Sequence, residues 1–228
     1  MRHILLFVSA GFGPFALAQL PPYVAQGFDP QDPGYYFITT NNLGGGPLGN
    51  RQALILDGAG QVVFRQRIAS VSNFRAWPDG RMSYATRGKH ILIDHSFAPI
   101  DSVGCANEVP NDLHELRILE NGHYVLLGME EVTMDLSAYP VFQHGNASGS
   151  ANALVKSAVI QELNAAKELV WQWRAVDHFD FLDTDTSRLT NPNVVDWTHS
   201  NAVEVDSDGN FLLSSRHFSE ITKVDRLA

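Results

Sequence analysis

Short runs of alternating apolar and polar residues fill most of the chain and are separated by tight turns. The clearest turns are Asp79-Gly80, Asn121-Gly122 and Asp208-Gly209, each of which lies between two apolar runs. Glycine after Asp or Asn favours a hairpin there, because glycine adopts the positive φ that such a turn requires. We therefore predict an antiparallel strand pair around each of the three turns.

The spacing of these turns indicates a structural repeat. Gly122 follows Gly80 by 42 residues and Gly209 follows Gly122 by 87, close to one and two periods of about 43 residues. Repeats of this length that contain strands and turns are typical of β-propeller blades. We therefore predict an all-β chain with the architecture of a β-propeller.

A second type of hairpin alternates with the first. It is predicted over residues 53–64, 90–103 and 159–173. The last of these segments also contains Ala and Glu residues that favour a helix, but its apolar residues alternate at period two, which favours strands. One hairpin of each type makes the four strands of a blade.

The hairpins divide most of the chain into blades, of which we predict three complete ones and part of a fourth. The blades are placed at residues 34–68, 71–104, 112–174 and 200–226. We expect an inserted loop at residues 131–157, which are rich in Gly, Ser and Asn, and a connecting loop at residues 175–198. Because a partial ring leaves sheet edges unpaired, we expect the chain to be truncated at its C-terminus or to depend on a partner.

The first eighteen residues differ in character from the rest. A basic start is followed by an apolar stretch and by Ala16-Leu17-Ala18, which fits a secretory cleavage site before Gln19. The alternative is a buried N-terminal strand or helix. We therefore divide the chain into a signal peptide at residues 1–18 and a partial β-propeller domain at 19–228, and expect the protein to be periplasmic or secreted.

Composition excludes several classes of function. Lys and Arg number 16 against 25 Asp and Glu, so the net charge is −9, and the cations are scattered. Nucleic-acid binding needs clustered cations, so we expect no nucleic-acid partner. No segment after the signal peptide is long enough to span a membrane, so we expect no membrane insertion. The sequence does not indicate the oligomeric state.

Several common sites are not expected either. Cys105 is the single cysteine and has no second cysteine with which to form an internal disulfide. The sequence has no Cys/His spacing typical of zinc, no glycine-rich phosphate loop and no nucleophile elbow, so we predict no metal site and no cofactor.

Three polar clusters precede predicted inner strands, and each contains a histidine. The clusters are residues 112–115, 177–180 and 196–201. Inner strands of a propeller line its central channel, so we expect His114 and His199 to meet there, with His178 as a weaker candidate because it lies in a loop. Arg216 lies 7 residues after Gly209, so it returns along the paired strand towards His199. Its guanidinium suits a sulfate or phosphate oxygen pair.

Each of these residues also has a structural interpretation. His199 would then only cap its loop, and Arg216 would pair with a carboxylate such as Glu204. We expect His123 to be solvated. If Arg216 and His217 both belong to a strand, His217 points to the face opposite Arg216.

Several segments together resemble one family. These segments are Asp196-Trp-Thr-His-Ser-Asn, Asp208-Gly-Asn-Phe-Leu-Leu-Ser-Ser-Arg-His, Ile221-Thr-Lys-Val-Asp-Arg, Asp112-Leu-His-Glu-Leu and Glu120-Asn-Gly-His. They resemble the nucleotide-independent arylsulfate sulfotransferases over about residues 35–226, with residues 196–226 as the specific part.

The resemblance implies a six-bladed propeller that moves a sulfuryl group from an aryl sulfate to a phenol through a sulfated histidine. His114, His199 and Arg216 are similar to catalytic residues of the family, and Asn201 is similar to an asparagine at its substrate site. We add His178 as a second substrate-binding candidate. The family needs no cofactor or nucleotide donor.

The sequence differs from the family pattern at one catalytic residue. The sulfated histidine of the family lies in a later blade, beyond the strand that ends at Arg226, so we expect this chain to be inactive by itself. The main alternative is a non-catalytic exported propeller that binds a ligand or a protein. A weaker alternative, suggested by Trp171 and Trp173, is a propeller enzyme that uses sugars or quinones.

Overall fold

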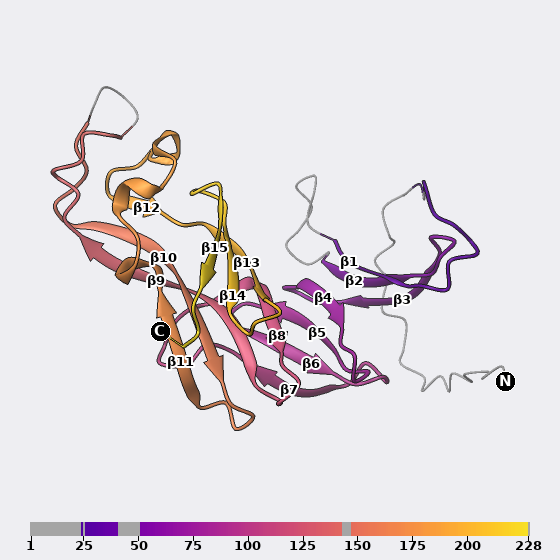
Figure 1. The fold of residues 1–228 in the computed structure, drawn as a ribbon. Coiled ribbons are helices and arrows are strands. Elements are labelled where there is room, and N and C mark those ends of the chain that lie inside the picture. The colour runs from indigo at the N-terminus through magenta and orange to yellow at the C-terminus, as the bar shows by residue number, and fades with distance from the viewer. Residues whose placement is uncertain (1–23, 25, 41–50, 143–146, 228) are drawn as a thin grey trace.

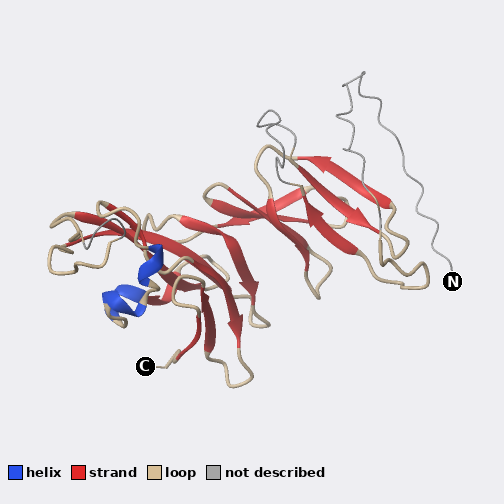
Figure 2. Cartoon of the chain, turned by 90° about the horizontal axis from the view of Figure 1, so that it is seen from above, coloured by secondary structure: helices blue, strands red, loops and turns tan. Residues whose placement is uncertain are grey.

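The structure is a computed structural model that describes residues 24, 26–40, 51–142 and 147–227. The predicted signal peptide lies outside the described residues. Strands predominate over the described part, and three short 3-10 helices lie to one side of the longest sheet (Figure 2). None of the helical turns in these ranges has the length and apolar character of a membrane-spanning helix. The prediction of an all-β chain is confirmed.

Four sheets follow one another along the chain. The first contains β1 (Tyr36–Thr39), β2 (Gln52–Leu56) and β3 (Val62–Arg67), and the second contains β4 (Ser72–Ala76), β5 (Met82–Thr86), β6 (Lys89–Ile93) and β7 (Pro99–Val103). The third contains β8 (Asn111–Ile118), β9 (Tyr124–Met134), β10 (Ala153–Leu163) and β11 (Leu169–Arg174), and the fourth contains β13 (Ser200–Val205), β14 (Phe211–Ser215) and β15 (Glu220–Val224). Consecutive strands within each sheet pair antiparallel. Within the described residues, the first sheet has three strands, one fewer than predicted.

The hairpin turns share one hydrogen-bond pattern. At the turn between β4 and β5, Trp77 N–H donates to Arg81 O at 2.9 Å, and Gly80 N–H donates to Trp77 O at 3.0 Å. The fourth residue of the turn has positive φ, +84° at Gly80. The pattern recurs at residues 57–61, 94–98, 119–123, 164–168 and 206–210. It is the three-residue hairpin loop in which a residue with positive φ forms a bulge, and it confirms the predicted hairpins.

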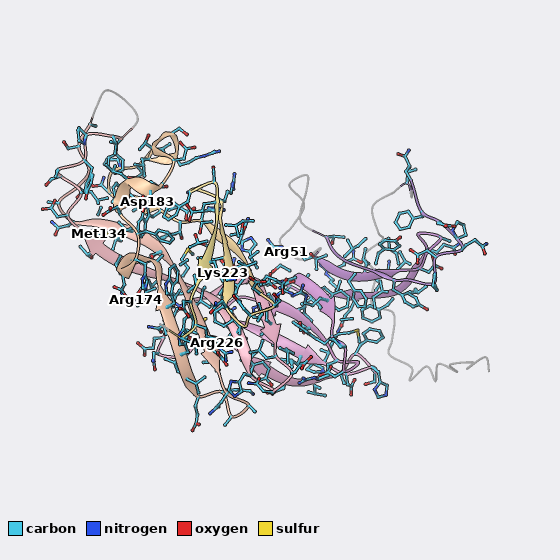
Figure 3. All side chains as sticks on the ribbon, viewed as in Figure 1. Arg51, Met134, Arg174, Asp183, Lys223 and Arg226 are labelled. Carbon is cyan, nitrogen blue, oxygen red and sulfur yellow. The ribbon has the colours of Figure 1, made fainter. Side chains whose placement is uncertain are left out.

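The expected insertion in the third sheet is mostly strand. β9 and β10 pair continuously from Tyr124 opposite Leu163 to Met134 opposite Ala153, so only residues 135–152 lie outside them. Met134 marks the far end of this long hairpin (Figure 3). Val155 is fully buried, and Val132 packs against the same core. The prediction of a loop at 131–157 is wrong because this apolar packing outweighs the Gly, Ser and Asn residues nearby.

The segment after β11 is also more ordered than a connecting loop. It forms η1 (Ala175–Asp177), η2 (Phe181–Asp183), η3 (Thr186–Arg188) and β12 (Val194–Asp196), and β12 pairs parallel with β10. Phe181 and Trp197 are buried in the largest apolar core. This packing fixes the start of the polar cluster at residues 196–201.

The first strands of the sheets lie next to one another in chain order. β4 contacts β1 and β8, and β8 contacts β13 (Figure 1). Ion pairs cross these contacts: Arg75 Nη1 lies 2.7 Å from Glu115 Oε1, and Arg117 Nη2 lies 2.6 Å from Glu204 Oε2. Two of the predicted polar clusters, on β8 and at the start of β13, therefore lie on neighbouring strands.

His123 is half-buried and held in an ion pair, whereas the sequence predicted a solvated side chain. Its Nδ1 lies 2.7 Å from Glu162 Oε1, and the Glu162 side chain is 1% exposed. Arg226 pairs with the same carboxylate. Because Glu162 belongs to β10 and Arg226 follows β15, this buried ion pair joins the third and fourth sheets.

Candidate functional site

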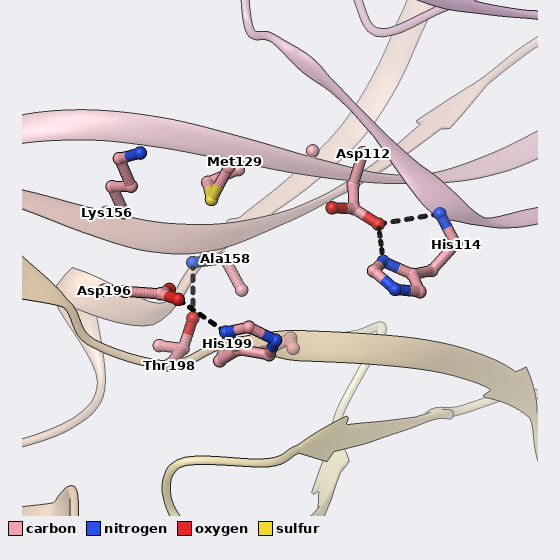
Figure 4. A pocket seen from close by; sticks show the side chains of 10 residues that line it. Asp112, His114, Met129, Lys156, Ala158, Asp196, Thr198 and His199 are labelled. Atoms are coloured by element: carbon pink, nitrogen blue, oxygen red, sulfur yellow. Dashed lines mark hydrogen bonds and ion pairs between the residues drawn. The ribbon is translucent and has the colours of Figure 1, made fainter. Parts of the chain in front are cut away.

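A cavity of about 120 Å³ lies where the third sheet meets the start of β13 (Figure 4). Its lining residues are Asp112, His114, Gly128, Met129, Lys156, Ala158, Asp196, Thr198, His199 and Ser200. Two of the three predicted histidines therefore line one cavity, and each comes from a different sheet.

His114 lies in a bulge of β8, where the pairing with β9 shifts register between Asn111 and Leu116. The bulge leaves backbone carbonyls without ladder partners, and β4 supplies them. Ser72 Oγ donates to Leu113 O at 3.1 Å, and Asn73 Nδ2 donates to His114 O at 2.6 Å. The second sheet thereby holds the histidine at the cavity.

The carboxylate of Asp112 orients the His114 ring. His114 Nδ1 lies 2.6 Å from Asp112 Oδ1, and the backbone N–H of His114 donates to the same oxygen at 2.8 Å. This hydrogen bond to Asp112 raises the pKa of His114 above its usual value, against the opposing effect of burial. The arrangement leaves Nε2 as the ring nitrogen available to a ligand, in a ring biased towards its cationic form.

His199 stands directly before β13 with φ of +44°, a left-handed conformation that is uncommon for residues other than glycine. Its Nδ1 lies 2.5 Å from Asp196 Oδ2, and its Nε2 lies 3.3 Å from Arg216 Nη1. A carboxylate only accepts and a guanidinium only donates. His199 therefore carries its proton on Nδ1 and a lone pair on Nε2.

Arg216 lies opposite His199 across the hairpin, at the height that the spacing predicts. Its backbone N–H donates to His199 O at 3.2 Å, directly after β14 ends at Ser215. The side chain is exposed and does not pair with Glu204, which pairs with Arg117.

His217 corrects a prediction. It does not point away from the site, because β14 ends at Ser215 and the chain turns at Arg216–Ser219 instead of continuing as a strand. The His217 ring is buried, its centroid lies 4.6 Å from that of His199, and its Nδ1 lies 2.6 Å from the backbone O of Asp196. Asp196, His199 and His217 thus form a cluster whose possible ligand atoms all lie within 4.8 Å of one another.

The structure does not bring the other two candidates into the cavity. Asn201 occupies the bulged position of β13 between Ser200 and Ala202 and does not line the cavity. His178 is exposed and stacks on Trp173, with ring centroids 5.0 Å apart. His178 therefore lies against the end of β11.

Sequence reasoning missed the roles of Asp112, Asp196, Lys156 and His217. The two aspartates carried a signal, since each precedes its histidine by two or three residues in a polar cluster. Lys156 carried none, because it belongs to the segment that was expected to be a loop.

Comparisons with known proteins identify the family to which the chain belongs. The family model described as Arylsulfotransferase (ASST) matches residues 46–228. No curated protein matches the chain. A solved protein of unknown function from Bacteroides caccae is 12% identical, with a TM-score of 0.46 over 77% of this chain and 50% of that one. A streptogramin B lyase structure is 9% identical, with a TM-score of 0.41 over 85% of this chain and 57% of that one.

The chain thus spans about half the length of these two solved structures. The family match covers most of the chain, including both histidines of the cavity and Arg216. The chain therefore belongs to the arylsulfotransferase (ASST) family, as the resemblance predicted.

Proposed function

We propose that this chain binds an aryl sulfate in the cavity between His114 and His199 and takes part in transferring its sulfuryl group to a phenol. Family membership supports the class of reaction. One observation carries the choice of site: both histidines line the same cavity with Nδ1 held by a carboxylate, and a guanidinium lies beside Nε2 of His199.

Arg216 is the proposed ligand of the sulfuryl oxygens. The transferred group carries charge on three oxygens, and a fixed guanidinium stabilises that charge in the transition state. The Arg216 side chain is exposed and donates to His199, so its other N–H groups remain for a substrate. Lys156 adds a second cation to the cavity wall, since its nearest carboxylate, Glu131, is 3.9 Å away.

His114 is the proposed acid and base. When the S–O bond of the aryl sulfate breaks, the cationic His114 gives its proton to the leaving phenolate. When the acceptor phenol attacks sulfur in the second half-reaction, the now neutral His114 takes the phenol proton and returns to its starting form. The raised pKa of His114 suits the first of these steps.

The sulfuryl group passes through a sulfated histidine, as the resemblance implies. A histidine nitrogen forms an S–N bond as the S–O(aryl) bond breaks, and the acceptor phenol later replaces that nitrogen. The resemblance assigns this nitrogen to a later blade. We therefore assign His199 to contact with the sulfuryl group and to orienting Arg216.

The architecture and the location of the protein are part of the proposal. The four sheets would be consecutive blades of a six-bladed propeller, which the contacts between their first strands support. The protein would be exported after cleavage before Gln19. N-terminal sequencing of the exported protein tests this, because an intact Met1 would contradict it.

The experiment follows binding and transfer separately. Calorimetry with 4-nitrophenyl sulfate measures binding by the full chain, and the absorbance of 4-nitrophenol measures transfer to added phenol. Arg216→Ala should weaken binding by at least about tenfold, because it removes a charge-assisted hydrogen bond. Arg81→Ala is the matched control, since Arg81 pairs with Asp79 in a distant turn and should bind like the wild type.

Each outcome decides between the alternatives. Binding that Arg216→Ala weakens supports the proposed site, and release of 4-nitrophenol in addition would exclude the non-catalytic binding module. Binding that is absent, or equal in the wild type and Arg216→Ala, overturns the proposed site.

A further inference from the structure

We propose that the Asp–His–His cluster of Asp196, His199 and His217 binds one divalent transition-metal ion, for which Zn²⁺ is the probe. Two imidazoles and one carboxylate are ligands that zinc and related ions accept, with further positions left to water. The possible ligand atoms lie within 4.8 Å of one another. Tetrahedral zinc with bonds of about 2.1 Å needs ligand atoms about 3.4 Å apart, so the side chains would have to rotate to bring these atoms to that spacing.

His217 is arranged as a ligand. Its Nδ1 lies 2.6 Å from the backbone carbonyl oxygen of Asp196, which can only accept, so Nδ1 carries the proton. The neutral ring then presents the Nε2 lone pair. A histidine that donates one N–H to a carbonyl and offers the other nitrogen is the usual arrangement in metal sites, because the hydrogen bond fixes the tautomer and the ring direction.

The position of Arg216 selects the side of His199 on which an ion can bind. The guanidinium lies 3.3 Å from Nε2 and repels a cation there. Nδ1 faces the Asp196 carboxylate at 2.5 Å, so the ion would take the place of the shared proton between these two groups. Metal binding commonly releases ligand protons in this way.

Hydrogen bonds hold the backbone around the cluster. His217 N–H donates to Thr198 O at 3.2 Å, and Asp185 N–H donates to His217 O at 2.7 Å. Thr184 Oγ1, which is buried, donates to Trp197 O at 3.0 Å. The three ligands therefore come from two segments that are tied to each other, which lowers the conformational entropy that an ion must fix.

A second cavity gives an ion access to the cluster. It has a volume of about 230 Å³ and is lined on one side by Asp196 and His217 and on the other by residues 188–191. Water in this cavity would complete the coordination. The second cavity is lined by neither His114 nor His199, so the metal site is separate from the proposed sulfuryl function except for the shared Asp196 and His199.

Calorimetry with Zn²⁺ alone tests the proposal on the full chain, without aryl sulfate. We expect binding of one ion to the cluster with micromolar affinity or better. His217→Asn should weaken it by at least about tenfold, because this variant keeps an amide donor for the Asp196 carbonyl but loses the Nε2 ligand. Asp196→Asn should weaken it similarly. His95→Ala is the matched control, since His95 is exposed in the second sheet.

Two further measurements distinguish loss of the metal site from misfolding of the variant and from metal binding elsewhere on the chain. Zn²⁺ should raise the melting temperature of the wild type and of His95→Ala but not of His217→Asn. Co²⁺ in place of Zn²⁺ should give visible absorption bands that His217→Asn removes. Absence of zinc binding, or binding that survives in both folded cluster variants, overturns the proposal. Neither result bears on aryl sulfate binding, which is measured without metal.

Discussion

Nδ1 of His199 lies 2.5 Å from the Asp196 carboxylate, although the two residues are only three positions apart. The contact depends on the left-handed conformation of His199, which turns the ring back over the end of β12. Holding a residue other than glycine in this conformation costs on the order of 1 kcal/mol, which the fixed backbone of the cluster offsets. Because Asp196 holds the proton on Nδ1, the Nε2 atom of His199 presents its lone pair to Arg216.

Removing the Asp196 carboxylate should weaken the binding of aryl sulfate. Asp196→Asn no longer holds the Nδ1 proton by charge, so the ring loses its fixed tautomer and its alignment with Arg216. We expect the affinity of the full chain for 4-nitrophenyl sulfate, measured by calorimetry, to fall by at least about tenfold, because Arg216 loses its oriented partner. The control is Asp79→Asn, because the equivalent turn at Asn121-Gly122 already accepts asparagine. Equal affinity for 4-nitrophenyl sulfate in Asp196→Asn and the wild type would contradict this role.

Asp112→Asn should lower the pKa of His114. The hydrogen bond to Asp112 is the main cause of the raised pKa, and burial acts in the opposite direction. Without the carboxylate, the histidine should therefore titrate at lower pH, as followed by the NMR shifts of its ring protons. Since only the cationic form of His114 attracts an anionic aryl sulfate, the decline of 4-nitrophenyl sulfate binding with rising pH should move to lower pH in the same variant.

The control for this titration is Asp94→Asn, which removes a carboxylate from a turn of the second sheet. The pKa of His114 should not move in this variant. A pKa of His114 that is unchanged in Asp112→Asn would show that the carboxylate does not set its protonation.

His90 should make the fold sensitive to acid. Its side chain is fully buried in β6, and neither ring nitrogen has a hydrogen-bond partner among the described residues. Burial lowers its pKa to about 4. Below a pH of about 6.5, His90 therefore takes up a proton in the unfolded chain but stays neutral in the folded chain. The contribution of neutral His90 to the free energy of unfolding is complete above that pH and is lost as the pH falls towards 4.

The expected loss is up to about 3 kcal/mol in the free energy of unfolding, since each unit of pKa shift corresponds to about 1.4 kcal/mol. Urea unfolding at pH 7 and pH 4.5 measures it. His90→Leu should reduce the difference between the two pH values, whereas His95→Asn should leave it as in the wild type. A difference of the same size in His90→Leu would assign the acid sensitivity to other groups.

Glu162→Gln should destabilise the junction of the third and fourth sheets. The carboxylate is buried and pairs with both Arg226 and His123. Neutralising it leaves the Arg226 guanidinium with no full charge partner there, and breaking a buried pair costs about 3 kcal/mol. Urea unfolding gives the change, and Glu168→Gln at an exposed turn is the control. A loss below about 1 kcal/mol would show that water replaces the partner.

The hairpins could be predicted because their turn residues have a local cause. Gly80, Gly122 and Gly209 all take the positive φ that the turn requires. The same turn occurs with Phe97 and Lys167 at that position, with φ of +63° and +66°, where composition gives no such signal. At those two turns, the alternation of the flanking strands indicated the hairpin.

The site was less accessible to sequence reasoning, and the reason is geometric. Spacing from the turns placed His114, His199 and Arg216 at similar heights, because strand rise is regular. It misplaced His217, since the end of β14 at Ser215 depends on a turn with Ser219 at φ of +52° and no glycine to mark it. Asn201 was misplaced by the bulge between Ser200 and Ala202, which breaks the alternation of faces.

Asp196 lines both the cavity of His114 and His199 and the cavity of His217. The two cavities therefore share one carboxylate, and ligands bound in them would be thermodynamically linked. A ligand that displaces or neutralises this carboxylate from one side changes the affinity of the other side, and linkage makes the factor equal in both directions. If both proposals hold, occupancy on the His217 side would tune the proposed sulfuryl pocket without blocking its entrance.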